Sequence, residues 1–182
     1  MEHPKREERF LPFCSFVVLD VLMAAATASS PSAPVTRLTE QASAWFGVTL
    51  NPHPERAVAF QLDDATIGIL HHDGLLEIPV PAPIRTVLVD EELARPHAAR
   101  PGADWVAVRV HTEDDVDPAT LLLRLSYLYR RLLRSQAPAV LRRIRIELGQ
   151  YALPEALGDL YETMLAKRDN GPSALPGTPS SA

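Results

Sequence analysis

The sequence predicts an α+β fold, in which an antiparallel sheet of about four strands is flanked by helices and followed by a helical C-terminal extension. Three observations predict it. Apolar and polar residues alternate in short runs between residues 56 and 111, as half-buried strands require. Leucines recur at helical spacing between residues 117 and 134. Pro138 and Pro154 mark the starts of two further helices, since proline favours the first helical position.

The composition is that of a soluble globular chain with room for one domain. Its 182 residues are 46% hydrophobic, which suffices for one core and leaves little for a second full domain. The excess of 23 Asp+Glu over 18 Lys+Arg gives a net charge of −5, which argues against general nucleic-acid binding. The single cysteine, Cys14, excludes a disulfide framework within this chain.

Four segments are expected along the chain. They are a leader without fixed structure at residues 1–34, the α+β domain at 35–134, a helical extension at 135–168 and a disordered tail at 169–182. The leader has a charged start and an apolar run from Phe10 to Met23, which is also the pattern of a signal segment. Because Asp20 interrupts this run, we expect a cytoplasmic protein, with export or anchoring through residues 1–28 as the alternative.

The first elements of the domain are one helix and three strands. The helix runs from residue 36 to 46 and is closed by Gly47. Strands are expected at residues 58–62, 67–71 and 76–80, joined by two-residue turns at Asp63-Asp64 and Asp73-Gly74.

These turns imply a register for the sheet. A two-residue turn at Asp73-Gly74 pairs His71 with Leu76, and the same count continues along both strands. This register puts His71 on the core-facing side at the rim of the sheet. It puts Glu77 on the other face, together with His72.

The remaining elements are mostly helical. A short helix is expected near residues 83–93, and residues 105–111 alternate as a fourth strand. Asp117 and Pro118 then open a long helix, because aspartate caps helix starts and proline suits the first helical turn. Two shorter helices, at residues 138–148 and 154–167, complete the extension.

The first candidate site is for ligand binding and consists of Glu77, Arg85, Trp105 and Arg109. A carboxylate beside guanidinium groups could orient a small acidic or phenolic ligand over the indole. The alternative is a structural ion pair packed against a tryptophan, which is common away from functional sites.

Histidines supply the candidates for proton transfer, and neither a metal nor another cofactor is expected. His71 and His72 are adjacent on one strand, so their side chains point to opposite faces and cannot both ligate one ion without a bulge. His71 is the better proton acceptor at a pocket edge, whereas Glu77 would orient the ligand.

An arginine run in the last helices is the basis of a different interpretation. Its seven members are Arg124, Arg130, Arg131, Arg134, Arg142, Arg143 and Arg145. Such a run can dock a protein or nucleic-acid partner, and a non-enzymatic interaction module is therefore the alternative function. A solvated helix face explains the run equally well, and the net charge is negative, so neither nucleic acid nor a membrane is an expected partner. The oligomeric state stays open.

Several short motifs in order resemble the luciferase-domain family, which is largely uncharacterised and is named after the fungal luciferases. The motifs are Thr-Ile-Gly-Ile-Leu-His71, Leu-Glu-Ile-Pro, Ile-Arg85, Ala-Arg-Pro-His97, Asp-Trp105-Val and Leu-Leu-Arg-Leu-Ser-Tyr127. The resemblance rests above all on His71, His97 and Trp105. The end of this stretch is also similar to the MmcQ/YjbR-like family, which bears on the fold alone.

The resemblance implies a small α+β domain that, in the fungal enzymes, uses molecular oxygen on a polyphenolic pyrone without a bound metal or flavin. Fungal members have a His-x-His pair where this chain has Ile69-Leu70-His71. The expected function is binding of a small aromatic or acidic ligand near His71, Glu77, His97 and Trp105. If the protein is catalytic, metal-free oxygenation is expected, with His71 or His97 as the base.

The leader carries the first testable prediction. N-terminal sequencing of protein purified from its native host should show an N-terminus upstream of Thr27. A start at Thr27 or Ser29 would show that the segment is cleaved for export, and the expected cytoplasmic location would be wrong.

Overall fold

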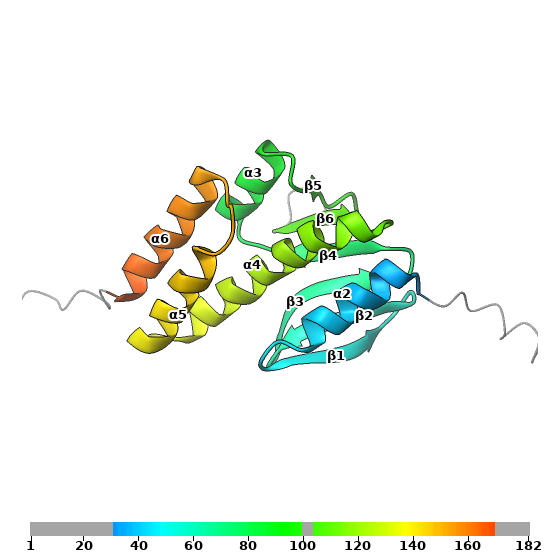
Figure 1. The fold of residues 1–182 in the computed structure, drawn as a ribbon, viewed down its shortest axis with the longest axis horizontal. Helices are drawn as coiled ribbons and strands as arrows, with labels where there is room; N and C mark the ends of the chain where they lie inside the picture. Colours follow the sequence, from blue (N-terminus) through cyan, green and yellow to red (C-terminus); the bar gives the residue numbers. More distant parts are fainter. Residues whose placement is uncertain (1–30, 100–103, 170–182) are drawn as a thin grey trace, which may run out of the picture. The chain divides into compact units, whose positions relative to one another are not determined.

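A computed structural model describes residues 31–99 and 104–169 of the chain (Figure 1). The expected tail beyond residue 169, and all of the expected leader up to residue 30, lie outside the described residues. Helix α2 (Ala33–Ser43) begins inside the segment expected to be leader. Pro34 lies in its first turn, and Val35, Leu38 and Ala42 form a buried stripe that holds the helix against the core.

The α+β class is confirmed, and within the described residues the sheet has six strands, where about four were expected. Its spatial order is β1-β2-β3-β4-β6-β5, with every neighbouring pair antiparallel. The strands are β1 (Val48–His53), β2 (Ala57–Leu62), β3 (Ala65–His71), β4 (Leu75–Pro79), β5 (Arg95–Pro96) and β6 (Trp105–Arg109). The additional strands β1 and β5 form the two edges of the sheet. Each contains a proline, which edge strands tolerate because one side makes no ladder bonds.

The register of the β3–β4 hairpin corrects the sequence prediction by one residue. Ile69 pairs with Glu77 and Leu70 with Leu76, instead of Ile69 with Ile78. The cause is a three-residue loop, in which the Gly74 N–H donates to the His71 carbonyl over 3.0 Å. Gly74 adopts φ +85°, the left-handed conformation that follows a type I turn in three-residue hairpin loops.

The β2–β3 register is also shifted, by a β-bulge at Ile67. The two-residue turn at residues 63–64 is as expected, since Leu62 pairs with Ala65. The register then shifts between Phe60 and Gln61, so that Phe60 pairs with Gly68. An extra residue in one strand turns all following side chains to the other face. The expected register placed Ile69 and His71 on the core-facing side. Because of the bulge, both side chains lie on the opposite face.

The main hydrophobic core lies between one face of the sheet and the helices (Figure 1). The long helix α4 (Val116–Arg134) packs over β3 and β4, α2 packs over β1, and α3 (Ala82–Asp90) contacts β5 and β6. This core includes Phe60, Leu76 and Val106 from the sheet and Leu123 from α4. The opposite face, which we call the His71 face, carries His71, Glu77 and Ala107 and a small apolar cluster of Ala57, Ala59 and Ile69 beside Trp105.

The expected helical extension belongs to the same core. Helices α5 (Pro138–Leu148) and α6 (Glu155–Asp169) pack against each other, against α4 and against α3. Their buried side chains, among them Ile144 and Leu157, are members of the main cluster. The buried Tyr161 hydroxyl donates a 2.8 Å hydrogen bond to the Leu125 carbonyl of α4. Residues 135–168 therefore stabilise the domain from which α4 comes.

Two glycine substitutions test the hairpin geometry. A Cβ at Gly74 would lie 2.3 Å from the Val110 carbonyl oxygen, in addition to the strain of φ +85°. We expect Gly74→Ala to lower the free energy of unfolding by about 1–3 kcal/mol or more in urea titrations.

The matched control is Gly158→Ala in α6, where a Cβ would meet nothing within 4 Å. This change should raise the free energy of unfolding by about 0.5–1 kcal/mol, because alanine is the better helix former. Equal effects of the two substitutions would contradict the three-residue loop.

Candidate functional site

Three polar side chains meet on the His71 face of the sheet. His71 ends β3, Glu77 lies in the middle of β4, and His97 directly follows β5. The Nε2 atom of His97 lies 2.8 Å from Oε1 of Glu77, and Nε2 of His71 lies 3.5 Å from Oε2 of the same carboxylate. Their side chains are only 15% (His71), 17% (Glu77) and 7% (His97) exposed. One carboxylate therefore lies between two imidazoles in a largely water-excluded place.

The two imidazoles make different contacts with Glu77. The His97 contact is a hydrogen bond, and because an ionised carboxylate only accepts, the proton is on Nε2 of His97. The His71 contact has an ion-pair distance but not the geometry of a hydrogen bond. Nε2 of His71 is buried and has no hydrogen-bond partner among the described residues. A buried polar atom in this state costs free energy until a partner binds it.

Strand β6 brings Trp105 and Arg109 to the same face. It pairs with β4 so that Ala107 lies opposite Glu77, with Trp105 and Arg109 two residues away on either side. The Trp105 ring meets the His97 ring edge to face, with centroids 6.3 Å apart and an interplanar angle of 74°. The expectation that Trp105 and Arg109 join Glu77 on one face agrees with this pairing.

The arginines do not pair with Glu77 as the first candidate site supposed. Arg109 donates to Oδ2 of Asp73 over 3.0 Å, at an exposed position. The pKa of Asp73 is lowered mainly by a hydrogen bond from the Leu75 backbone N–H, and further by the hydrogen bond and the charge of Arg109. Partial burial opposes this shift. Arg85 lies on α3, and none of the contacts found joins it to Glu77. The carboxylate takes imidazole partners in place of guanidinium partners.

Sequence reasoning separated His71 from Glu77, and this was wrong. The one-residue register shift places Glu77 opposite Ile69, so both His71 and Glu77 lie on the His71 face. The acidic partner of His97 was also missed, since His97 follows a two-residue strand that no alternation could reveal. The motif Ala-Arg-Pro-His97 was the only available signal for this position.

A pocket of about 270 Å³ opens beside this cluster. Glu77, His97, Arg95 and Arg109 supply its charged or polar side chains, and alanines supply much of the remainder. The pocket does not include His71, which lies on the other side of the Glu77 carboxylate. A small ligand group in this pocket would meet Glu77 and His97 directly.

The part of the chain that carries this cluster is similar to a known protein family. Residues 64–126, about a third of the chain, match the family model of the Luciferase domain. The segment is assigned to the luciferase-domain family. The matched range includes His71, Glu77, His97 and Trp105. No curated protein and no solved structure matches the chain. The likeness to MmcQ/YjbR-like proteins therefore stays a prediction.

Ser126, the last residue of the matched segment, and Tyr127, which follows it, hold the fold together. The buried Ser126 hydroxyl donates to the Pro79 carbonyl at the end of β4 over 2.9 Å. The Tyr127 hydroxyl donates to the Phe46 carbonyl, beyond the end of α2, over 3.0 Å. These bonds fix α4 against the strand that carries Glu77.

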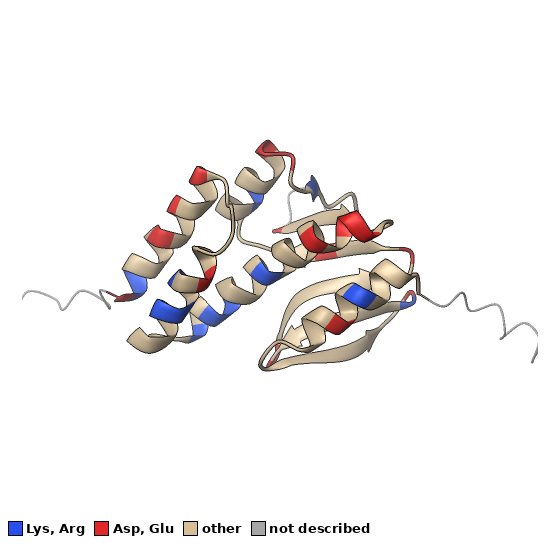
Figure 2. Cartoon of the chain, in the orientation of Figure 1, with Lys and Arg blue, Asp and Glu red and all other residues tan. Residues whose placement is uncertain are grey.

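The arginine run is mostly committed to contacts within the chain, which does not favour the interaction module. Arg134 pairs with Asp63 and Asp64, and Arg145 pairs with Glu162 and Asp169. Arg124 pairs with Glu147 of α5. Figure 2 shows the same arrangement, with basic residues on α4 and α5 and acidic residues along α6.

The described part of the chain contains neither a metal site nor a membrane-spanning helix. No group of three or more His, Cys, Asp or Glu side chains in residues 31–99 and 104–169 meets the requirements of a metal site. Nor does this part of the chain contain a helix with the length and apolar character needed to cross a membrane.

The shared carboxylate yields a prediction for Glu77→Gln. A hydrogen bond to a charged acceptor contributes more than one to a neutral acceptor, so the free energy of unfolding should fall by about 1–2 kcal/mol. In ¹⁵N spectra of the wild-type side chains, Nε2 of His97 should carry the proton, and its resonance should move in the variant.

Glu91→Gln is the control, because Glu91 is exposed at the end of α3. It should change neither the stability nor the imidazole resonances. A proton on Nδ1 of His97 in place of Nε2 would contradict the assigned hydrogen bond.

Proposed function

We propose that this luciferase domain binds a small aromatic or acidic molecule at Glu77 and His97 and uses an imidazole to accept its proton. The observation that carries the proposal is the buried Nε2 of His71, which has no hydrogen-bond partner among the described residues and lies 3.5 Å from Glu77. A ligand hydroxyl in the adjoining pocket would meet Glu77 and His97 directly, and His71 lies behind the same carboxylate, with its Nε2 next to Oε2.

The surroundings favour an aromatic ligand. The Trp105 ring is in edge-to-face contact with His97 and packs against the buried side chains of Ala57, Ala59 and Ile69, so the place beside the cluster is apolar. Aromatic rings pack well in such arrangements, where an edge meets a face. Acidic groups on the ligand would meet Arg95 and Arg109, which line the adjoining pocket.

The chemistry would begin with proton transfer from a phenol or enol to His71 or His97. His71 is the favoured base, since its Nε2 makes no hydrogen bond that the transfer must break, and the Glu77 carboxylate, 3.5 Å away, would relay the proton from a ligand in the adjoining pocket. The resulting carbanion or enolate can add molecular oxygen at carbon. The peroxide anion then takes the proton back from the imidazole, so substrate and O₂ together yield a hydroperoxide. The resemblance to fungal luciferases supports this reaction without a metal or flavin.

Ile69 bears on how far the fungal chemistry extends to this chain. It lies directly opposite Glu77 on the His71 face, two residues before His71. A histidine at this position, as in the fungal pattern, would add a third imidazole to the cluster. Its replacement by an apolar residue favours ligand binding over oxygenation as the function of this chain.

The test is identification of the ligand that co-purifies with the protein. Native mass spectrometry of protein from its own host should show a bound small molecule on the wild type and on His53→Ala. His53 is an exposed histidine of β1 and serves as the matched control.

His97→Ala and His71→Gln should each reduce the bound fraction at least about tenfold, because each removes an interaction of the order of 1.4 kcal/mol or more. Unchanged occupancy in both variants would place the ligand elsewhere and would overturn the proposal. If His97→Ala loses the ligand and His71→Gln keeps it, the ligand site at Glu77 and His97 stands, but His71 is not the base.

A further inference from the structure

We propose that the luciferase-domain protein has a second ligand site, on the helical side of the sheet, which takes an uncharged aromatic molecule. This molecule carries a carbonyl acceptor at one end and a hydroxyl donor at the other. The site is the pocket between Trp45, α4 and the connection from α5 to α6. It is independent of the proposed function at Glu77, because it shares no residue with that site.

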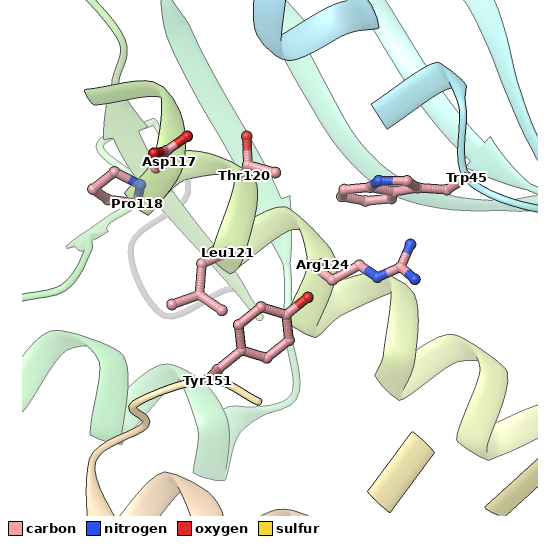
Figure 3. Close-up of a pocket in the computed structure, with 7 residues that line it drawn as sticks. All are labelled: Trp45, Asp117, Pro118, Thr120, Leu121, Arg124 and Tyr151. Carbon is pink, nitrogen blue, oxygen red and sulfur yellow. The ribbon is translucent and has the colours of Figure 1, made fainter. Parts of the chain in front are cut away.

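The pocket has the size and lining of a small-molecule site. Its volume is about 660 Å³, more than twice that of the pocket beside Glu77, and ligand pockets usually measure about 300–1,000 Å³. Figure 3 shows Trp45, Leu121 and Tyr151 around it, with Asp117 and Pro118 toward one end and Arg124 toward the other. An apolar middle between two polar ends suits a flat molecule with polar groups at its ends.

Arg124 offers a hydrogen-bond donor at its end of the pocket. Its guanidinium carbon lies 4.6 Å from the Trp45 ring centroid and 4.4 Å from that of Tyr127. Its Nε donates to Glu147, which leaves Nη1 buried without a hydrogen-bond partner among the described residues. A buried N–H of a charged group is costly to leave unpaired, so a ligand carbonyl would gain a charge-assisted hydrogen bond.

The charges around the pocket select a neutral ligand over an anion. Glu147 already offsets the charge of Arg124, and the Asp117 carboxylate lines the other end. One guanidinium thus stands against two carboxylates. A ligand carboxylate would add a further negative charge to a partly desolvated place, whereas a ligand hydroxyl can donate to Asp117.

Two hydroxyl groups complete the polar lining. Thr120 donates its proton to Oε1 of Gln41 over 2.9 Å, so its oxygen can still accept a hydrogen bond from a ligand. Burial and the nearby Glu147 carboxylate raise the pKa of Tyr151, although Arg124 opposes the shift. The Tyr151 phenol therefore keeps its proton at neutral pH and remains a donor.

The two indoles allow the two sites to be distinguished in one experiment. Trp45 lines this pocket, whereas Trp105 contacts His97 on the His71 face. In ¹⁵N-labelled full-length protein, the indole N–H resonances are assigned with Trp105→Phe. The probe is 6-hydroxynaphthalene-2-carboxamide, and the anionic comparison is 6-hydroxynaphthalene-2-carboxylate.

We expect the carboxamide to move the Trp45 resonance to saturation and to leave Trp105 in place. The carboxylate should bind about tenfold more weakly, because of the added charge. Leu121→Phe narrows the pocket and should weaken carboxamide binding at least about tenfold. Leu133→Phe is the matched control, since Leu133 is a 38% exposed residue of α4 outside the pocket. The Leu133→Phe protein should bind the carboxamide with the affinity of the wild type.

A second variant guards against misfolding of Leu121→Phe. The double change Arg124→Met with Glu147→Gln removes the donor and the ion pair together, so no buried charge is left alone. It should also weaken carboxamide binding at least about tenfold. Any of three results would overturn the second site. They are a Trp45 resonance that does not shift at millimolar carboxamide, tighter binding of the carboxylate than of the carboxamide, and wild-type affinity in both Leu121→Phe and the double variant.

Discussion

The constraint on which the Glu77 site depends is the alternation of side chains along a strand, combined with two local irregularities. In a strand, neighbouring side chains point to opposite faces, so one added residue reverses every following position. The bulge at Ile67 reverses β3, and the extra residue in the 72–74 loop keeps β4 in step with it. Together they place His71 and Glu77 on the same face. Without the bulge, Ile69 and His71 would point into the main core.

The helical layer fixes this sheet in place and carries the second pocket. Helix α4 is tied to β4 through the Ser126 bond to Pro79, and to the end of α2 through the Tyr127 bond to Phe46. The same helix presents Leu121 and Arg124 to the pocket beside Trp45. One element therefore supports the strand that carries Glu77 and contributes lining side chains to a pocket on the opposite side of the sheet. It is buried by the sheet, α2 and α5, and Tyr161 of α6 donates a hydrogen bond to it.

The two sites differ in how they neutralise a carboxylate. Glu77 lies between two imidazoles, whose ring nitrogens can donate or accept a proton, so its surroundings are suited to proton transfer. Glu147 is paired with a guanidinium, which stays charged, so its pocket is suited to recognition alone. The matched luciferase-domain segment, residues 64–126, contains Glu77 and also Arg124. Both arrangements thus involve residues of the segment that defines the family.

The sequence by itself determined most of the helices and strands, and it contained the motifs that resemble the luciferase-domain family. Alternation and leucine spacing predicted β2, β3, β4, β6 and α4, because these patterns reflect burial on one side of an element. The resemblance singled out His71, His97 and Trp105, which the structure does bring near Glu77.

Only the tertiary structure decided which side chains meet. A bulge and a one-residue difference in loop length leave the local sequence pattern almost unchanged, yet they decided the face on which His71 lies. The short strand β5 exists because β6 pairs with it, and it carries His97 to Glu77. The pocket at Trp45 combines residues from the end of α2, from α4 and from the α5–α6 connection. Such a pocket arises when helices distant in sequence pack together, which local patterns do not encode.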